Sequence, residues 1–143
     1  MSAFKETVGF NLMKLCKGYF NALNTKLNRL DVYEGQDHLL RHLWEEDGLP
    51  QAELTRRLGV EPASVSKAIE RMEKAGLITR RPSPDDARAN LISLTEVGRA
   101  LEQPVKAAWE EVEGQLLAHM TSEERLLLRR LLLQMRDNLK GGE

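Results

Sequence analysis

The stretch Leu54–Thr95 constrains the fold more than any other part of the chain, because two helical patterns precede two β-prone runs. Leu54 and Leu58 share one face of a first helix, and Gly59 can end that helix because glycine readily adopts the left-handed conformation. Pro62 suits the first turn of a second helix. The apolar stripe of this second helix comprises Val65, Ala68, Ile69 and Met72.

The other face of the second helix carries small hydroxyl residues near its start and cations further along. Such a face suits the DNA major groove, where small residues let the backbone approach while serine and basic side chains reach phosphates or base edges. The candidate DNA contacts here are Ser64, Ser66, Lys67 and Arg71, with Gln51 and Thr55 of the preceding helix as candidate phosphate contacts. Ser64 has a second interpretation, since its hydroxyl can instead bond the first N–H groups of its own helix.

Two β-prone segments follow, separated by a charged turn. Leu77–Thr79 and the run NLISLT (residues 90–95) predict strands joined by SPDDAR, which makes a β-hairpin wing. Asp86 lies two residues before Arg88, so its carboxylate can hold the guanidinium facing outward toward phosphate or a narrow minor groove. Arg80, Arg81 and Arg88 are candidate DNA contacts, although hairpin cations are often only solvated charges.

The helix-turn-helix, the segment GLITRR, the D-x-R pair Asp86 and Arg88 and the segment LISLTEVGRAL together resemble the winged-helix signature of the multiple-antibiotic-resistance regulators, the MarR family. The resemblance extends over nearly the whole chain. It implies a homodimeric bacterial or archaeal transcription regulator that binds a pseudo-palindromic operator in double-stranded DNA, usually as a repressor released by a small phenolic or other ligand. In this family the ligand pocket lies where the first, second and fifth helices meet the winged helix. The candidate lining residues are therefore Tyr19, His38, Arg41, His42 and Trp109.

Helical patterns bracket this module on both sides. Apolar residues step by three or four along a first helix at about Lys5–Leu30, and a second helix is predicted at about Gln36–Glu46. After the wing, Thr95 is a plausible N-cap for a helix that Pro104 should interrupt near Leu101 by removing a backbone hydrogen bond.

The last helix begins at a capping box, Thr121 to Glu124, and contains LLLRRLLLQM, which is apolar around more of its circumference than a monomer surface tolerates. We therefore expect residues 1–32 and 100–143 to form a helical dimerisation region and residues 33–99 to form the winged helix-turn-helix domain. Two-fold pairing would place two recognition helices roughly 34 Å apart, about one turn of DNA.

Charge and hydropathy narrow the possible classes of protein. The net charge is −1, but residues 51–90 hold 8 Lys and Arg against 6 Asp and Glu, whereas both flanks are net acidic. No apolar run approaches the ~20 residues that span a bilayer, and the first ten residues lack the apolar core of a signal peptide. We expect a cytoplasmic protein with no membrane association.

Cys16, the only cysteine, excludes a disulfide framework and a zinc ribbon. We interpret it as a buried, inert thiol, although some members of the resembled family sense organic hydroperoxides through a cysteine in the first helix. Tyr19 falls one turn away on the same face, and tyrosines hold the thiolate in those sensors. His38 and His42 have a spacing that two metal ligands can share, but we favour pocket lining and predict no metal or cofactor.

An enzyme is the competing class. The sequence has no glycine-rich phosphate loop, no nucleophile elbow and no Cys–His pair at a recognisable spacing, so we predict a non-enzymatic protein. The sequence predicts a mainly α-helical fold with a small β-hairpin wing, in a DNA-binding transcription regulator. The alternatives are a redox-sensing regulator acting through Cys16, and a winged helix that contacts only protein and so needs no outward cation such as Arg88.

Overall fold

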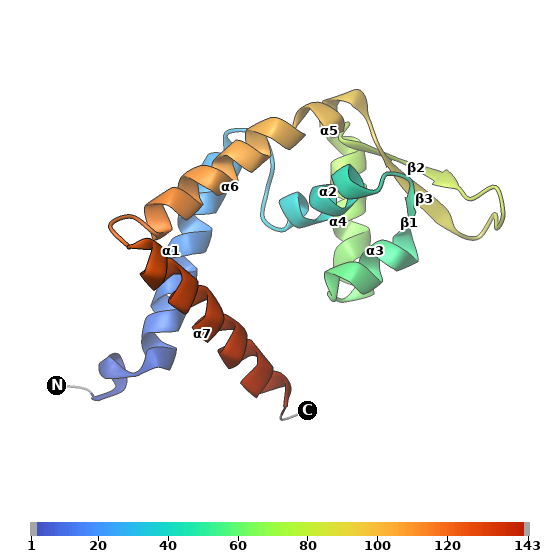
Figure 1. Cartoon of the computed structure of the whole chain (residues 1–143). Helices are drawn as coiled ribbons and strands as arrows, with labels where there is room; N and C mark the ends of the chain where they lie inside the picture. The colour runs from blue at the N-terminus through green and yellow to red at the C-terminus, as the bar shows by residue number, and fades with distance from the viewer. Residues whose placement is uncertain (1–2, 142–143) are drawn as a thin grey trace. The chain divides into compact units, whose positions relative to one another are not determined.

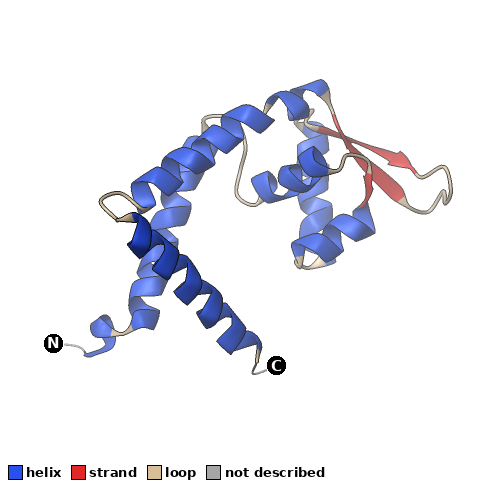
Figure 2. Cartoon of the chain, in the orientation of Figure 1, coloured by secondary structure: helices blue, strands red, loops and turns tan. Residues whose placement is uncertain are grey.

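The computed structural model describes residues 3–141, most of which are helical (Figures 1 and 2). The predicted fold class, mainly α with a small wing, is confirmed. In chain order the elements are η1 (Ala3–Glu6), α1 (Val8–Asn28), α2 (Gln36–Glu45), β1 (Leu49–Pro50), α3 (Gln51–Leu58), α4 (Pro62–Lys74), β2 (Ile78–Pro82), β3 (Asn90–Leu94), α5 (Glu96–Ala100), α6 (Glu102–Leu116) and α7 (Ser122–Lys140).

The chain forms two compact units, the first ending at Trp109 and the second beginning at Glu110, so the boundary falls within α6. The predicted domain ranges also include residues 1–2 and 142–143, which lie outside the described residues. None of the helices in residues 3–141 combines the length and apolar character that a membrane crossing requires.

The helix-turn-helix of the first unit forms as predicted. Gly59 adopts a left-handed φ of 63° at the end of α3, and Pro62 is the first residue of α4. The sequence prediction for the first helix needs one correction, because α1 begins at Val8 and a separate 3-10 turn precedes it. Thr7 causes this start, since its side-chain oxygen accepts a hydrogen bond from the Phe10 N–H and caps the helix.

The sheet has three antiparallel strands in the order β1-β3-β2. Figure 2 shows the β2–β3 hairpin extending beyond the neighbouring helices of the first unit as a wing. The strand β2 is longer than the β-prone run and continues through Arg81, which pairs with Leu91. The strand β1, in which Leu49 pairs with Ile92, was not predicted from the sequence, because a two-residue strand ending in proline has no periodicity to detect.

A polar clamp joins the parts of the winged helix. Asp47 Oδ1 accepts hydrogen bonds from the N–H groups of Gly48 and Leu94, both at 2.9 Å, and its Oδ2 accepts from Arg99 at 2.8 Å. Thr95 caps α5 as predicted and also donates from Oγ1 to the Gly76 carbonyl at 2.6 Å. These two side chains join the segment after α4, the end of β3 and the helix α5 to one another.

The interruption predicted at Leu101 is confirmed, since α5 ends at Ala100 and α6 begins at Glu102. Pro104 then lies in the first turn of α6, where a missing N–H costs little. In the second unit the predicted capping box is also confirmed. Thr121 Oγ1 accepts from the Glu124 N–H at 3.1 Å, and the Glu124 carboxylate accepts from the Thr121 N–H at 2.9 Å.

Both terminal helices keep large apolar side chains exposed. On α1, Leu23 and Leu27 are buried, but Val8 is 69% exposed and Leu15 is 50% exposed. The helix α7 has no buried residue within its described span. Its exposed leucines are Leu126, Leu127, Leu131, Leu132, Leu133 and Leu139.

Gly98 provides a test of the packing of α5 against Leu77. A methyl group at this buried position would collide with the Leu77 carbonyl oxygen and lie 3.2 Å from Leu94 Cδ2. We expect Gly98→Ala to lower the free energy of unfolding by about 1–3 kcal/mol, measured by urea denaturation at fixed protein concentration.

The matched control is Gly114→Ala in α6, where an added Cβ meets no heavy atom within 4 Å. Alanine's higher helix propensity should there raise stability by up to about 1 kcal/mol. Equal destabilisation by both changes would contradict the close packing of α5 against Leu77.

Candidate nucleic-acid interface

The outward face of α4 carries the polar residues that the sequence analysis singled out. Val65, Ile69 and Met72 are almost completely buried and fix the rotation of the helix about its axis, whereas Ala68 is half-buried. The opposite face therefore points to solvent. The predicted DNA contacts Ser64, Ser66, Lys67 and Arg71 are all exposed there, as are Ala63 and Glu70.

Two candidates on α3 make hydrogen bonds of their own. The half-buried Gln51 donates from Nε2 to Ser66 Oγ at 3.1 Å and so links α3 to α4. Thr55 donates from Oγ1 to the Gln51 carbonyl at 3.0 Å. The Thr55 hydroxyl hydrogen is thus engaged within α3 and is not directed to solvent.

The two arginines of β2 occupy different faces of the wing, although they are adjacent in the sequence. Because successive strand residues point to opposite faces, Arg80 shares a face with its partner Ile92, and Arg81 lies on the other face. Arg80 Nη2 lies 3.4 Å from Glu73 Oε1 on α4. Arg81 is exposed and makes no ion pair within residues 3–141.

At the tip of the wing, Asp86 acts on Arg88 differently from the prediction. Asp86 Oδ1 accepts a hydrogen bond from the Arg88 backbone N–H at 3.0 Å, and the Asp86 carbonyl accepts from Ala89 at 3.0 Å. The predicted carboxylate–guanidinium pair is absent from the described residues, because in this turn the backbone N–H two residues on is the nearer donor. Asp86 therefore shapes the turn, and the Arg88 side chain extends from it, exposed.

Other cations of the module are neutralised within it. Glu53 accepts hydrogen bonds from Arg56 Nε at 3.0 Å and from Arg57 Nε at 2.9 Å. These hydrogen bonds lower the pKa of Glu53 to about 2, with the larger contribution from Arg56, so the carboxylate stays ionised at neutral pH. Arg57 also donates to Glu46 Oε2 at 2.8 Å, which ties α3 to the end of α2.

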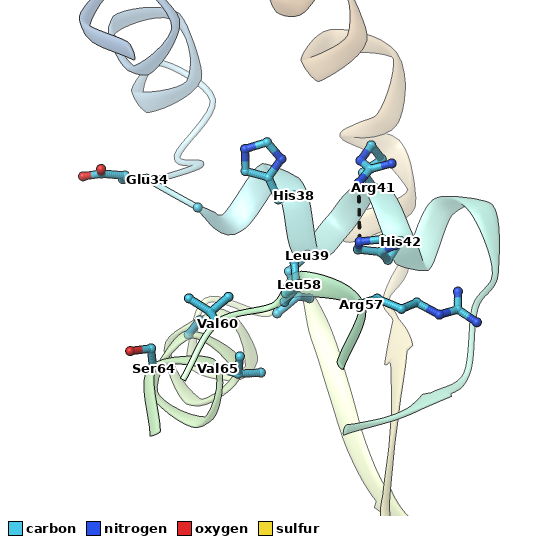
Figure 3. Close-up of a pocket in the computed structure, with 12 residues that line it drawn as sticks. Glu34, His38, Leu39, Arg41, His42, Arg57, Leu58, Val60, Ser64 and Val65 are labelled. Carbon is cyan, nitrogen blue, oxygen red and sulfur yellow. Dashed lines mark hydrogen bonds between the residues drawn. The ribbon is translucent and has the colours of Figure 1, made fainter. Parts of the chain in front are cut away.

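A pocket of about 510 Å³ lies between α2, the end of α3 and the first turns of α4. Figure 3 shows His38, Arg41 and His42 projecting from α2 on one side, with Val60, Ser64 and Val65 across the pocket. Lining residues that were not predicted from the sequence include Glu34, Arg57, Leu58 and Val60. The loop between α1 and α2 brings Glu34 there, and the end of α3 with the α3–α4 connection brings the other three, a packing that no short motif indicated.

The polar side of this pocket has a defined charge state. Burial first, and then the Arg41 charge, lower the pKa of His42, which favours the neutral imidazole. Arg41 Nη2 lies 3.4 Å from His42 Nε2, and because a guanidinium can only donate, this ring nitrogen is the acceptor. Arg57 is engaged by two carboxylates, whereas Arg41 has one exposed partner, Glu45, at 3.5 Å. Arg41 is therefore the cation most available to a ligand here.

Two of the residues expected to line a pocket lie elsewhere. Trp109 Nε1 donates to Asp37 Oδ2 at 2.9 Å, and the indole packs edge-on against Trp44, with ring centroids 6.4 Å apart. Tyr19 packs against Phe20 on α1, at 5.5 Å between ring centroids. Neither lines the pocket of Figure 3.

The prediction that Cys16 is a buried thiol is wrong. This residue is exposed on α1. The apolar residues Leu12 and Leu15 on this part of α1 are exposed as well, so an apolar pattern alone did not establish burial of the thiol.

Comparisons with known proteins agree with this architecture. Residues 32–89 match the model of the MarR family. The chain is 32% identical over 112 residues to YdgJ, an HTH-type transcriptional regulator of Bacillus subtilis, covering 78% of this chain and 68% of that protein. It is 31% identical over 93 residues to an HTH-type transcriptional repressor of Mycobacterium tuberculosis, covering 65% and 67% of the two chains.

A solved structure extends the match over nearly the whole chain. It is a crystal structure of a cysteine-to-serine mutant of MarR from E. coli complexed with operator DNA. The TM-score is 0.81 at 25% identity, covering 94% of this chain and 99% of that chain.

Proposed function

Since the chain belongs to the MarR family of transcriptional regulators, and is therefore not an enzyme, we propose that it represses transcription as a homodimer bound to a pseudo-palindromic operator. The helix α4 would read the major groove, Arg88 would lie in or beside the minor groove, and a small ligand would release the DNA. The name of the mycobacterial relative supports the repressor role. Acting on chromosomal DNA, the protein would work in the cytoplasm.

The observation that carries this proposal is the solvent-facing surface of α4, on which Ser66, Lys67 and Arg71 are exposed opposite a fully anchored apolar stripe. Two wing cations without an ion-pair partner in residues 3–141, Arg81 and Arg88, extend this surface to the hairpin. Because cations already paired with carboxylates have little to offer a phosphate, these unpaired groups are the proposed DNA contacts. The E. coli protein that this chain resembles in fold was crystallised with operator DNA, which supports DNA binding as the function of this fold.

The first test is a gel shift of the purified protein with fragments of its own upstream region, repeated across salt concentrations. Arg81→Ala should reduce the slope of log affinity against log salt by about 1, because one phosphate contact is lost. Arg88→Ala should weaken binding at every salt concentration. The control is Arg29→Ala, which removes an exposed cation at the end of α1.

The two variants and the control separate this proposal from its alternative. If Arg88→Ala binds as tightly as the unaltered protein, the wing does not contact DNA. If no fragment shifts at low salt, a winged helix used only for protein contacts becomes the better account.

Exposed apolar side chains on the terminal helices support the homodimer. Six leucines of α7 and the first half of the α1 stripe remain uncovered within their own units. Apolar surface in that amount marks a protein interface in soluble proteins. We propose that a second copy covers both faces, so that residues 1–32 and 100–143 form the dimerisation region and residues 33–99 the DNA-binding domain.

Leu131, which is 41% exposed on α7, is the position we would test. Leu131→Glu should shift the molar mass measured by light scattering from two chains toward one, because an unpaired carboxylate in an apolar interface is costly. Operator affinity should fall with it, since two half-sites would no longer be bound together. The matched control, Gln134→Glu, adds the same charge at an exposed polar position of α7 and should leave the dimer intact.

The pocket in Figure 3 supports release by a ligand. Its apolar walls and the Arg41 cation suit a small arene carboxylate, and it contacts α4 directly through Ser64 and Val65. A molecule bound there would favour an α4 position that no longer matches the groove spacing. A coupling free energy of about 1–3 kcal/mol, or roughly 5- to 150-fold in operator affinity, would suffice.

Salicylate is the probe for this site. We expect it to lower operator affinity, measured by fluorescence anisotropy, and expect Arg41→Ala to abolish the effect without changing ligand-free binding. Salicylamide, which lacks the carboxylate, is the matched control ligand. Release by salicylamide as well would contradict the role of Arg41, and release by an organic hydroperoxide instead would favour redox sensing through the exposed Cys16.

A further inference from the structure

One side-chain hydrogen bond joins α3 to α4 in the described part of the chain. Gln51, the first residue of α3, donates from Nε2 to Ser66 Oγ on α4 at 3.1 Å. The amide is half-buried, whereas Ser66 is exposed on the proposed DNA-reading face. Gln51 therefore contacts a residue of the proposed DNA-reading face from the neighbouring helix α3.

This bond decides the hydrogen-bonding polarity of Ser66. A serine within a helix often donates its hydroxyl to the carbonyl four residues earlier, but Ser66 makes no such bond to Pro62. Its oxygen accepts from Gln51, and the hydroxyl hydrogen is left for a partner outside the protein. A free serine can either donate to a base edge or accept from one. Donation from the Gln51 amide occupies one of the two lone pairs of Ser66 Oγ and turns the O–H away from α3, so Ser66 presents its hydroxyl hydrogen outward as a donor.

The pair lies between two anchored helices. Leu54 of α3 is fully buried, and the Thr55 hydroxyl bonds the Gln51 carbonyl and stiffens that first turn. On α4, Val65 and Ile69 on either side of Ser66 are buried and anchor the helix. Neither partner needs large backbone movement to keep the bond when DNA approaches, so the orientation of the hydroxyl is set before binding.

We propose that Gln51 is a positioning residue that sets base preference: by donating to Ser66 Oγ, it makes Ser66 a donor that selects guanine over cytosine at one position of each half-site. This inference rests on the proposed DNA-binding function. In the major groove guanine presents two acceptors, N7 and O6, whereas cytosine presents the N4 amino donor. Exchanging G·C for C·G at that position therefore places the cytosine N4 donor, in place of a guanine acceptor, opposite the Ser66 hydroxyl donor.

The test is selection from a random-sequence duplex library with the full-length protein, followed by sequencing. The Ser66→Ala variant identifies the position that Ser66 reads, as the one whose preference it removes. At that position Gln51→Ala should reduce the guanine-over-cytosine preference by roughly 2- to 10-fold, the worth of one neutral hydrogen bond, and leave other positions unchanged.

Gln51→Glu gives the sharper result. A carboxylate can only accept, so the Ser66 hydroxyl must donate to it and present its lone pairs outward. The preference at that position should then move toward cytosine, even if the added negative charge weakens binding to all sequences. Loss of packing at Gln51 would not produce such an inversion, and thermal unfolding of each variant checks that the module remains folded.

The control is Arg81→Ala, which should weaken binding to all sequences and leave the selected sequence unchanged. A loss of affinity from Gln51→Ala that is equal for all four bases would overturn the inference and assign Gln51 to phosphate or packing. Retention of the guanine preference in Gln51→Glu would overturn it as well. If the unaltered protein selects no sequence at all, the proposed function itself fails, so the two failures are distinguishable.

Discussion

Burial of the apolar stripe on α4 is the constraint on which the remainder of the winged helix depends. Val65, Ile69 and Met72 lose nearly all contact with solvent, each contributing on the order of 1.5–3 kcal/mol from removal of apolar surface. This burial fixes the rotation of the helix. Because helical side chains occur every 100°, a fixed rotation decides which polar residues face solvent, and Ser66 and Lys67 do.

Electrostatic pairing then sorts the cations into structural and available groups. Arg56 is paired with Glu53 within α3, Arg57 ties α3 to Glu46 at the end of α2, and Arg99 of α5 is held by Asp47. Lys67, Arg81 and Arg88 have no such partner within residues 3–141. A near-zero net charge is thus compatible with a basic surface, because carboxylates within the module pair with Arg56, Arg57 and Arg99 and leave the cations of the surface unpaired.

The pocket next to α4 connects ligand chemistry to the proposed DNA-reading surface through shared residues. Ser64 and Val65 line its floor, while His42, with its lowered pKa, and Arg41 supply the polar side. A ligand here would contact α4 itself. Its effect on DNA binding would require no long chain of intermediate movements, since α4 borders both the pocket and the proposed DNA-reading surface.

The sequence by itself determined the local structure and the family. Gly59, Pro62, Thr95, Pro104 and the Thr121–Glu124 capping box act through backbone geometry within a few residues, so their consequences could be predicted without a fold. Contacts between residues that lie far apart in the sequence could not be predicted in this way. The pairing of β1 with β3, the Arg80–Glu73 ion pair, the Gln51–Ser66 bond and the Trp109–Asp37 bond depend on how elements pack. Tertiary structure decided them, because the register of a strand and the rotation of a helix are set by burial against partners that lie far away in the chain.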